Sequence, residues 1–396
     1  MDIDPRRFDR LPVRERKRAR EALARADAHP DGSPERLALE AEALLAANDF
    51  HRAVLRLERA ATLAPDQPGL TEALVGAYRR DSRHADAVRL AATVAAPGRA
   101  LLFEMATSLL ALGDCAQALA IFDRILAERP DHAASWLGSH AAALHLEGLA
   151  AGLARLDRAL TCPGANSRYW VYRYAYHRLL GEGAAAGAVF ASRLADDPRR
   201  RPPAESVDAL MPHLAPDLRL GAVTAEVLRA ALAMATGGGM VLEFGVRWGT
   251  SVNVLAASAG QEVHGFDSFE GLPEDWGAER AGVLSTGRAL PPVAATVTLH
   301  PGWFEDTLPP FLAAHPGPVR LVNIDSDVYS SARTVLTALK ERIRPGTILV
   351  FDEFIGNRTW AEDEYRAFME FVAETGARFE IAMVSPFTKQ VVVRVL

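Results

Sequence analysis

Cysteine is almost missing from this chain of 396 residues, which contains only Cys115 and Cys162. Two cysteines in unrelated contexts support neither a disulfide framework nor a zinc site, so we expect a reducing, cytoplasmic location. The sequence also lacks any uninterrupted apolar run of about 18 residues, which argues against a membrane-spanning helix. The charged N-terminus, MDIDPRRFDR, has no apolar stretch and does not resemble a secretory signal.

An excess of positive charge is missing as well. The net charge of −6 gives no global support for a nucleic-acid partner. The basic run Arg14–Arg20 lies on a predicted helix that continues through Ala28, and we interpret it as a solvated first helix rather than a contact with nucleic acid or an acidic membrane. Hydrophobic content of 49% and charged content of 24% are typical of globular proteins, and the length predicts two domains.

The middle of the chain, residues 34–200, repeats a frame of about 34 residues. Small residues at fixed places would let two helices approach closely, and a proline would end the second helix of each unit. Pro97 comes early in its unit, so the second unit is predicted to be short. The frame predicts about five units, which begin at Pro34, Pro68, Arg99, Ala133 and Ser167.

These units resemble tetratricopeptide repeats, which implies an all-α solenoid with a concave face. Two roles stay open for this array. It either binds a peptide or protein partner, or it only braces or dimerises the rest of the chain. Aromatic side chains crowd one predicted helix of the fifth unit, which indicates an interface or packing against the C-terminal half. They are Tyr169, Trp170, Tyr172, Tyr174 and Tyr176.

Composition changes at residues 201–221, where four prolines predict a linker. Predicted strands and helices then alternate, and the last two strands predict an antiparallel hairpin. This is the plan of a Rossmann-like class I methyltransferase, a mostly parallel sheet of about seven strands covered on both faces. The predicted order is a charged helix at 1–33, the solenoid at 34–200, the linker at 201–221 and the methyltransferase-like domain at 222–396.

One stretch, residues 240–273, carries the clearest ligand signal. It combines a strand ending on Glu243, a loop with Gly245 and Gly249, a helix, and a second strand ending on Asp267. Nucleotide-type ligands bind at such strand ends, and the terminal acid can accept hydrogen bonds from ribose hydroxyls. The glycine spacing fits neither a dinucleotide fingerprint nor a P-loop, which favours a nucleoside ligand such as S-adenosylmethionine. From this loop alone, an ordinary strand-to-helix turn is the alternative.

Acidic residues end two later predicted strands. Asp325 and Asp327 follow one strand, and Asp352 and Glu353 follow the next. Carboxylates that converge at one sheet edge repel each other unless a cation lies among them, and oxygen ligands suit Mg²⁺. The alternative is that these acids only cap helices and face solvent, which fits one acid per strand end better than two.

On four motifs, residues 240–396 resemble the macrocin O-methyltransferase family, which are metal-dependent sugar O-methyltransferases of macrolide biosynthesis. The motifs are DSFEGLP at 267–273, PGWFEDTLP at 301–309, IDSDVY at 324–329 and DEF at 352–354. The family usually has Asp-Asp-Tyr in the last motif, and it tends to have glycine where this chain has Ser326.

The resemblance implies S-adenosylmethionine and Mg²⁺ as cofactors. It places the metal on Asp325, Asp352 and Glu353. It places the cofactor on residues of the glycine loop and of the next two motifs, with the ribose on Asp267. The implied cofactor residues are Glu243, Gly245, Gly249, Thr250, Ser251, Asp267, Ser268, Trp303 and Phe304.

Methyl transfer from a sulfonium is an in-line displacement that needs an aligned oxygen nucleophile. A chelated hydroxyl is a better nucleophile, and a base must take its proton; Asp325 and Asp327 both stay open for that role. Residues 274–295 are predicted to form a mobile lid or a wall of the substrate site.

The predicted function is therefore an S-adenosylmethionine-dependent, Mg²⁺-dependent O-methyltransferase that acts on a hydroxyl of a sugar or glycosylated small molecule. One alternative is a peptide- or carrier-directed methyltransferase whose repeats select the substrate. The other is a repeat-based scaffold with a residual cofactor fold. Neither nucleic acid nor membrane is an expected partner, and the oligomeric state, a homodimer included, stays open.

Overall fold

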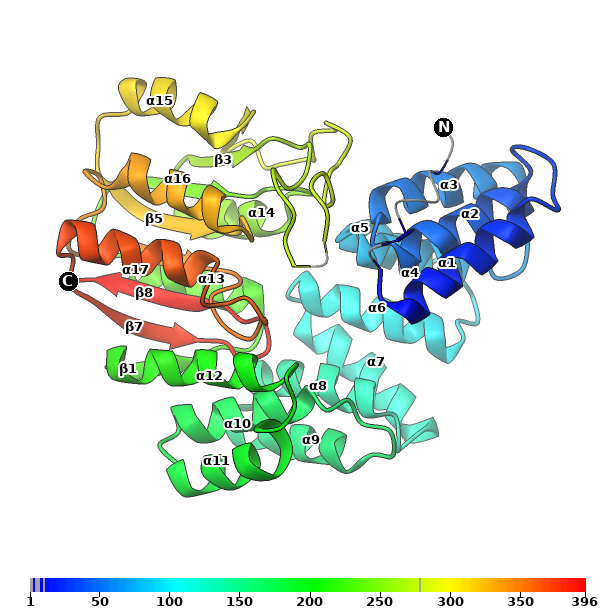
Figure 1. Ribbon diagram of the computed structural model, residues 1–396, viewed down its shortest axis with the longest axis horizontal. Coiled ribbons are helices and arrows are strands. Elements are labelled where there is room, and N and C mark those ends of the chain that lie inside the picture. The colour runs from blue at the N-terminus through cyan, green and yellow to red at the C-terminus, as the bar shows by residue number, and fades with distance from the viewer. Residues whose placement is uncertain (1–2, 4–7, 10, 278) are drawn as a thin grey trace. The chain divides into compact units, whose positions relative to one another are not determined.

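The computed structural model describes residues 3, 8–9, 11–277 and 279–396 (Figure 1). The chain forms two compact units, and each contains two separate stretches of sequence. The boundary near residue 112 falls inside the third predicted repeat. The first unit comprises Met1–Leu112 and Glu270–Leu290, and the second comprises Gly113–Phe269 and Pro291–Leu396.

The helices of the first unit follow the predicted repeat frame. The basic run lies on α1, Val13–Ala26, as predicted. Two of the predicted units begin where α2 and α6 begin, and the unit shortened by Pro97 contains a second helix of 8 residues, α5. The remaining helices are α2 Pro34–Ala46, α3 Phe50–Leu63, α4 Leu70–Arg80, α5 His84–Ala91 and α6 Arg99–Ala111.

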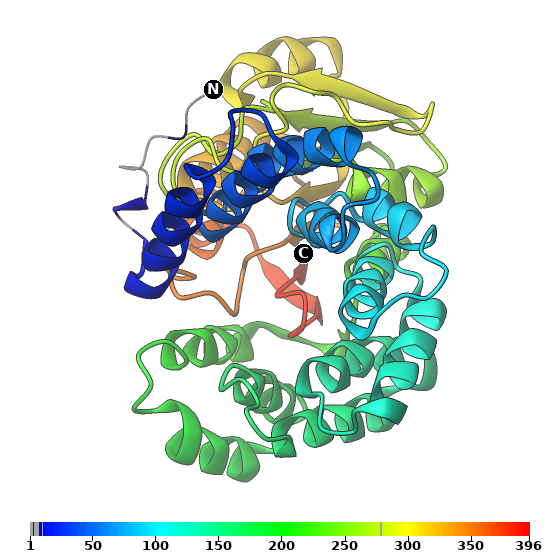
Figure 2. The same cartoon turned by 90° about the vertical axis from the view of Figure 1, so that its right-hand side faces the viewer.

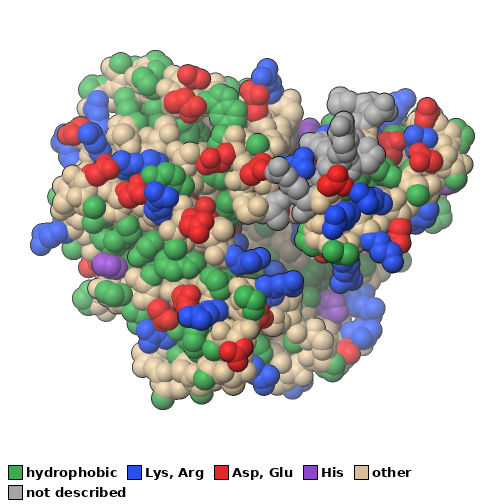
Figure 3. Space-filling view, in the orientation of Figure 1, with side chains coloured by type: hydrophobic (Ala, Val, Ile, Leu, Met, Phe, Trp, Pro, Cys, Tyr) green, Lys and Arg blue, Asp and Glu red, His purple; other side chains and the backbone are tan. Residues whose placement is uncertain are grey.

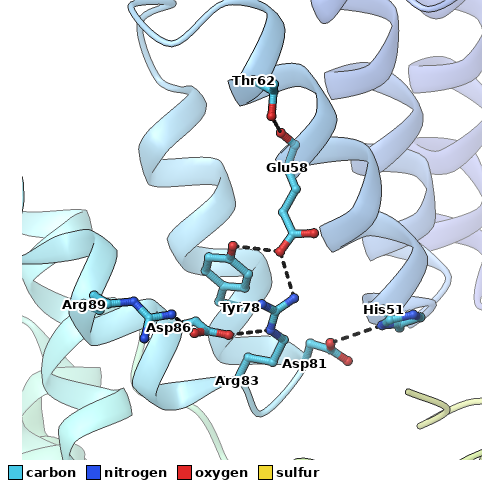
Figure 4. Close-up of polar contacts among 8 residues, drawn as sticks. All are labelled: His51, Glu58, Thr62, Tyr78, Asp81, Arg83, Asp86 and Arg89. Atoms are coloured by element: carbon cyan, nitrogen blue, oxygen red, sulfur yellow. Dashed lines mark hydrogen bonds and ion pairs between the residues drawn. The ribbon is translucent and has the colours of Figure 1, made fainter. Parts of the chain in front are cut away.

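The helices α3, α4 and α5 are joined by small buried residues and by a polar network. Ala53 and Ala60 have no exposed surface, so helices can approach at these positions. Glu58 accepts hydrogen bonds from the Tyr78 hydroxyl and from Arg83 Nη1, both at 2.9 Å (Figure 4). Because Glu58 lies on α3 and its donors belong to the next helix pair, the network fixes one repeat against the following one.

Part of the segment predicted to be a lid belongs to the first unit. Apart from residue 278, residues 270–290 form turns rather than helices or strands. Asn48, in the turn between α2 and α3, donates a hydrogen bond from Nδ2 to Glu279 Oε1 at 2.7 Å. A Cβ atom at Gly287 would lie 3.0 Å from His51 Nε2. The segment is therefore held on the first repeat, while its role as a lid stays a prediction.

The second unit begins with the remaining repeat helices (Figure 2). Its framework positions are small and buried, as the frame predicts. At Gly152, which takes the place of the usual alanine, a Cβ atom would lie 2.8 Å from Leu144 Cβ, so glycine allows α8 and α9 to approach. The helices are α7 Cys115–Glu128, α8 Ala133–Glu147, α9 Leu149–Thr161, α10 Tyr169–Leu179, α11 Gly183–Val189 and the π-helical η2 Phe190–Leu194.

The aromatic helix α10 packs against the C-terminal half, which was one of the two expectations for it. Val171 and Tyr174 belong to the same apolar cluster as the strand residues Leu242 and Phe244. The Tyr174 hydroxyl also donates to the Asp208 carboxylate at 2.7 Å. The last repeat and the sheet therefore share one core.

The predicted linker at residues 201–221 is replaced by regular structure. Its first half forms helix α12, Arg201–Leu210, with Pro202 and Pro203 in the first turn, where a missing N–H costs nothing. The helix is followed by the 3₁₀ turn η3, Met211–His213, and by strand β1, Leu214–Leu220. Pro216 is tolerated because β1 is an edge strand, paired only with β7.

The described residues form one sheet of eight strands, one more than predicted, because β1 joins its edge. The order is β1-β7-β8-β6-β5-β2-β3-β4. Pairing is parallel except where β8 meets β6 and β7, so the predicted closing hairpin is confirmed. The strands are β2 Met240–Phe244, β3 Val263–Asp267, β4 Val297–Pro301, β5 Val319–Ile324, β6 Ile348–Phe351, β7 Phe379–Val384 and β8 Val391–Val395.

Helices cover both faces of this sheet (Figure 1). Successive strand residues point to opposite faces, so Val241 packs with α13 and α14 while Leu242 packs with α15, α16 and α17. In the part of the chain that is described, no helix is both long and apolar enough to cross a membrane. The covering helices are α13 Thr224–Met234, α14 Thr250–Ala259, α15 Phe304–Ala314, α16 Tyr329–Leu339 and α17 Glu364–Thr375.

Candidate active site at the carboxyl ends of the strands

Four central strands end level with one another. Phe244 of β2 is in register with Phe266 of β3 and with Ile324 of β5, and Ile324 is in register with Phe351 of β6. The residues that follow these positions therefore meet at one edge of the sheet, all within the second unit. This register brings together the acids that the sequence placed at strand ends.

Gly245 allows the glycine loop to pass directly over the end of β5. Its φ of 95° is in the left-handed region, and a Cβ atom there would lie 1.7 Å from the Asp325 carbonyl oxygen. No side chain fits in that space. Glycine is therefore required at this position because the backbone of Asp325 lies against it, and the role of Gly245 in cofactor binding stays a prediction.

Glu243 is fully buried beneath the loop. Ser251 Oγ donates to its Oε1 at 2.7 Å, and Asn323 Nδ2 donates to its Oε2 at 3.4 Å. Burial raises the pKa of Glu243 to about 8, although both hydrogen bonds act in the opposite direction. Glu243 thus ties the start of α14 to β5, and contact with the methionine end of a cofactor stays a prediction.

The Asp267 carboxylate organises the glycine loop. Its Oδ2 accepts hydrogen bonds from the backbone N–H groups of Val246 and Arg247, at 2.9 and 2.7 Å. Its Oδ1 accepts one from the N–H of Phe269 at 2.7 Å. These bonds fix the loop at the end of β3, the place where the sequence predicts the ribose to bind.

The other predicted cofactor residues lie at three places. Gly249 caps α14 without a side-chain hydrogen bond, so the N–H groups of Thr250 and Ser251 lie at an open helix N-terminus. Trp303 caps α15, and the Phe304 ring packs edge-on against Phe244 with centroids 5.2 Å apart. Ser268, between Asp267 and Phe269, is partly buried.

Carboxylates gather at the ends of β5 and β6. Asp325, Asp327, Asp352 and Glu353 are all partly buried there. Burial, and then repulsion from Asp352 and Asp327, raises the pKa of Asp325 well above its usual range. Burial, and then the charge of Glu353, raises the pKa of both Asp327 and Asp352 to about 7. The predicted convergence of these four acids is therefore present.

Sequence reasoning missed three residues of this cluster. Glu364, the first residue of α17, is fully buried and accepts hydrogen bonds from the N–H groups of Ser326 and Glu353. Lys389 Nζ donates to both Glu353 oxygens, and Gln390 Nε2 donates to Asp352 Oδ1 at 2.7 Å. Residues 385–389 were predicted only as the turn of the closing hairpin. The neighbouring polar residues Lys389 and Gln390 were the one signal in the sequence that this turn could contact the acids.

The cluster contains ligands of the type that a hard divalent cation prefers, but their arrangement in this structure does not form a metal site. Its carboxylates offer oxygen ligands, and Asn323 Oδ1 and Ser326 Oγ are buried without a hydrogen-bond partner among the described residues. Within the same residues, no three acidic, histidine or cysteine side chains are arranged so that they could hold a metal ion. Glu353 would have to turn away from Lys389 to become a ligand.

Comparison with known proteins fits this site. A family model described as a methyltransferase domain matches residues 242–354, the span from β2 to the acids after β6. The chain is also similar to 8-demethyl-8-(2,3-dimethoxy-alpha-L-rhamnosyl)-tetracenomycin-C 4'-O-methyltransferase of Streptomyces olivaceus, with 31% identity over 143 residues. That alignment covers 29% of this chain and 53% of the relative, so the chain spans about half the length of that protein.

Two solved structures resemble separate parts of the chain. Calicheamicin methyltransferase CalS11 aligns with 43% of this chain and 77% of its own, at 23% identity and a TM-score of 0.37. YrrB, described as a TPR protein with an unusual peptide-binding site, aligns with 36% of this chain and 77% of its own, at 16% identity and a TM-score of 0.32.

Proposed function

We propose that the second unit is an S-adenosylmethionine-dependent O-methyltransferase whose acceptor hydroxyl binds over the acids at the ends of β5 and β6. The observation that carries this proposal is the level register of the four strand ends, with Asp267 and the glycine loop beside Asp325 and Asp352. The methyltransferase family match at residues 242–354 supports it. A sugar hydroxyl of a glycosylated natural product is the proposed acceptor, because the relative from Streptomyces olivaceus is named for such a substrate.

The chain's own residues would divide the work between two sides of this edge. Asp267 holds the loop from Gly245 to Gly249, and the open N-terminus of α14 lies next to it. When bound, S-adenosylmethionine supplies the methyl group as an electrophilic carbon on a sulfonium. Asp325 or Asp327 would accept the proton of the acceptor hydroxyl, and the glycine loop would align the two reactants for in-line attack.

We infer that Asp325, Asp352 and Glu353 hold Mg²⁺, which when bound would lower the pKa of the acceptor hydroxyl. The support is the donor set, since several partly buried carboxylates raise one another's pKa values. Glu353 could be a ligand only in a conformation in which it no longer bonds to Lys389.

Titration calorimetry with S-adenosylhomocysteine in EDTA tests the cofactor side. Wild-type protein should bind it, and Asp267→Asn should weaken binding by about tenfold or more, because a neutral amide cannot accept all the loop hydrogen bonds. Asp306→Asn, the same chemical change on the exposed first turn of α15, is the matched control. No binding by the wild-type protein would contradict the proposed function and favour the scaffold alternative.

The metal side needs a separate measurement. Mn²⁺, used as a paramagnetic substitute for Mg²⁺, should bind to the wild-type protein and fail to bind to Asp352→Asn, while affinity for S-adenosylhomocysteine stays within about twofold. Turnover is followed as the release of S-adenosylhomocysteine with a rhamnosylated tetracenomycin as the acceptor. Full turnover by Asp352→Asn would contradict the metal role and leave the methyltransferase proposal in place.

A second candidate, a peptide- or carrier-directed methyltransferase, is favoured by the repeat helices α2–α11. A chain shortened to residues 201–396 cannot test it, because it would remove Val171 and Tyr174 from the core that they share with the sheet. The full chain should instead be tested in parallel with carrier-protein acceptors and with a rhamnosylated tetracenomycin. Methylation of carrier-bound acceptors alone would favour this second candidate.

A further inference from the structure

A cavity of about 190 Å³ lies between the last repeat and the sheet domain, entirely within the second unit. Its walls come from α10, from the start of α12, from the loop after β6 and from the turn between β7 and β8. Val171, Val207 and Ile355 make part of its surface apolar. Pockets that enclose whole small molecules usually measure about 300–1,000 Å³, so this one suits a single group of a larger ligand.

Two arginines line one side of this cavity, and neither has a carboxylate partner in the described part of the chain. Arg168 and Arg200 are the residues just before α10 and α12. Arg200 donates from Nε to Ser167 Oγ at 3.0 Å and from Nη2 to Asn166 Oδ1 at 3.2 Å. The backbone N–H of Arg168 donates to the same amide oxygen at 3.0 Å. Neutral groups therefore orient the Arg200 guanidinium, and no ion pair among the described residues neutralises either arginine.

The surroundings favour an incoming negative charge. Burial, together with the positive charges of Arg168 and Arg199, lowers the pKa of Arg200 despite the nearby Asp197. Neither α10 nor α12 has a side-chain cap at its N-terminus, so both helix ends add partial positive charge there. A phosphate or carboxylate would relieve the repulsion and accept hydrogen bonds from the two guanidinium groups.

Another residue of the cavity lining contacts the acids of the proposed active site. Lys389 lines the cavity, and its Nζ lies 2.7 and 2.8 Å from the two Glu353 oxygens. The next residue, Gln390, binds Asp352. A ligand whose charged group lay at Arg168 and Arg200 would reach past the apolar wall toward the strand ends.

From this geometry we propose that the cavity binds an anionic group of the acceptor, a phosphate or a carboxylate, through Arg168 and Arg200. The inference rests on the proposed function for the identity of the ligand as an acceptor. It assigns a substrate-selecting role to the last repeat, because both arginines lie outside the sheet domain. It also gives a reason for the repeats to share a core with the sheet: the two guanidiniums must be held at a fixed place relative to the strand ends.

The test is titration calorimetry of the full chain with inorganic pyrophosphate and, separately, with malonate, at constant ionic strength. Wild-type protein should bind at least one of them with 1:1 stoichiometry. The double variant Arg168→Gln/Arg200→Gln should bind about tenfold or more weakly, because charge-assisted hydrogen bonds from both guanidiniums are lost. Stronger binding of pyrophosphate assigns the cavity to a phosphate, and stronger binding of malonate assigns it to a carboxylate.

Arg199→Gln is the matched control. It removes one positive charge next to Arg200 but not from the cavity lining, so it should change affinity by less than about twofold. No binding of either anion by the wild-type protein would overturn the proposal. So would equal losses in Arg199→Gln and in the double variant, since that result indicates general charge attraction.

Binding of S-adenosylhomocysteine to the same samples separates this proposal from the proposed function. Retained cofactor binding in the double variant, with anion binding lost, supports an acceptor subsite. Cofactor binding without any anion binding overturns the subsite and leaves the methyltransferase proposal standing. Anion binding without cofactor binding in the wild-type protein contradicts the methyltransferase proposal and supports the arginine cavity as an anion site in its own right.

Discussion

Lys389 Nζ lies 2.7 and 2.8 Å from the two carboxylate oxygens of Glu353, one of the acids that end β5 and β6. Burial lowers the pKa of Lys389, but the adjacent Glu353 outweighs it, so the net shift is upward and the ammonium is stable there. Lys389 also lowers the pKa of Asp327 and of Asp352 against the larger effect of burial. This one cation therefore limits the repulsion among several carboxylates.

Lys389→Met should destabilise the protein by about 1–3 kcal/mol, because it leaves Glu353 without its counter-ion. The loss is limited to this range because part of the pair is exposed to solvent. The double variant Glu353→Gln/Lys389→Met should recover part of that loss. Urea unfolding of the two single variants and the double variant gives the coupling between the side chains. Lys340→Met, on the exposed end of α16, should cost less than about 0.5 kcal/mol. Additive single effects would contradict the pairing.

Gly245→Ala should be far more damaging than the same change at Gly260. Both glycines have positive φ values, 95° and 65°, so both variants carry some backbone strain. A Cβ atom at Gly260 would meet nothing within 4 Å, which limits its cost to about 1 kcal/mol. At Gly245 the Cβ would overlap the Asp325 carbonyl, so we expect a loss above about 3 kcal/mol in urea unfolding, with loss of cofactor binding. Similar losses at both positions would contradict the close approach.

Local patterns were sufficient to predict the repeats and the strand ends. The period of the small residues located the helix pairs, and the early Pro97 predicted the short helix α5. Alternating apolar runs located the strands, and parallel pairing forces their carboxyl ends to one edge, so the meeting of Asp267, Asp325 and Asp352 was predictable.

Contacts between distant parts of the sequence were not predictable. Glu364 enters the acid cluster from the start of α17, after a loop whose path no motif fixes. Strand β1 contains Pro216 and lies in a proline-rich segment, so its sequence resembles a linker. Only its pairing with β7 in the structure identifies it as a strand. Nothing near Asn48 indicates a partner more than two hundred residues away at Glu279.

The contact between Asn48 and Glu279 predicts that the segment 270–290 becomes more mobile when the contact is removed. Asn48 has a φ of 57°, so Asn48→Gly removes the amide while relieving backbone strain. Hydrogen exchange at Leu272 and Gly282, whose N–H groups bond within the segment, should accelerate by about three- to tenfold in this variant.

Variants of Glu279, which accepts the hydrogen bond from Asn48, supply the control for this experiment. Burial raises the pKa of Glu279 despite the hydrogen bond from Asn48, so the uncharged Gln is a close substitute that still accepts the bond. Glu279→Gln should leave exchange unchanged, and Glu279→Ala should match Asn48→Gly. Unchanged exchange in both disruptive variants would mean that the segment is held by other contacts.

The stability of the second unit should depend on pH through His140, which is buried between α9 and α10. Its Nδ1 lies 2.9 Å from the Gly152 carbonyl oxygen and must donate to it, so Nε2 accepts from the Tyr176 hydroxyl at 3.0 Å. Burial lowers the pKa of His140 from 6.5 to about 4, with the Gly152 carbonyl acting in the opposite direction. Between these two pH values the unfolded chain binds a proton that the folded chain does not.

The contribution of neutral His140 is therefore complete above about pH 6.5 and decreases as the pH falls toward 4, by about 1 kcal/mol per pH unit. His300 and His264 also have lowered pKa values, because of burial first, and add slopes of the same sign. His140→Asn keeps a hydrogen-bond donor for Gly152 but does not titrate. Its free energy of unfolding in urea should therefore fall less steeply than that of the wild-type protein between pH 7 and pH 5, and the difference in slope should be the contribution of one proton. Parallel pH dependences for the variant and the wild-type protein would show that His140 takes up its proton without unfolding, and would contradict the buried neutral pair with Tyr176.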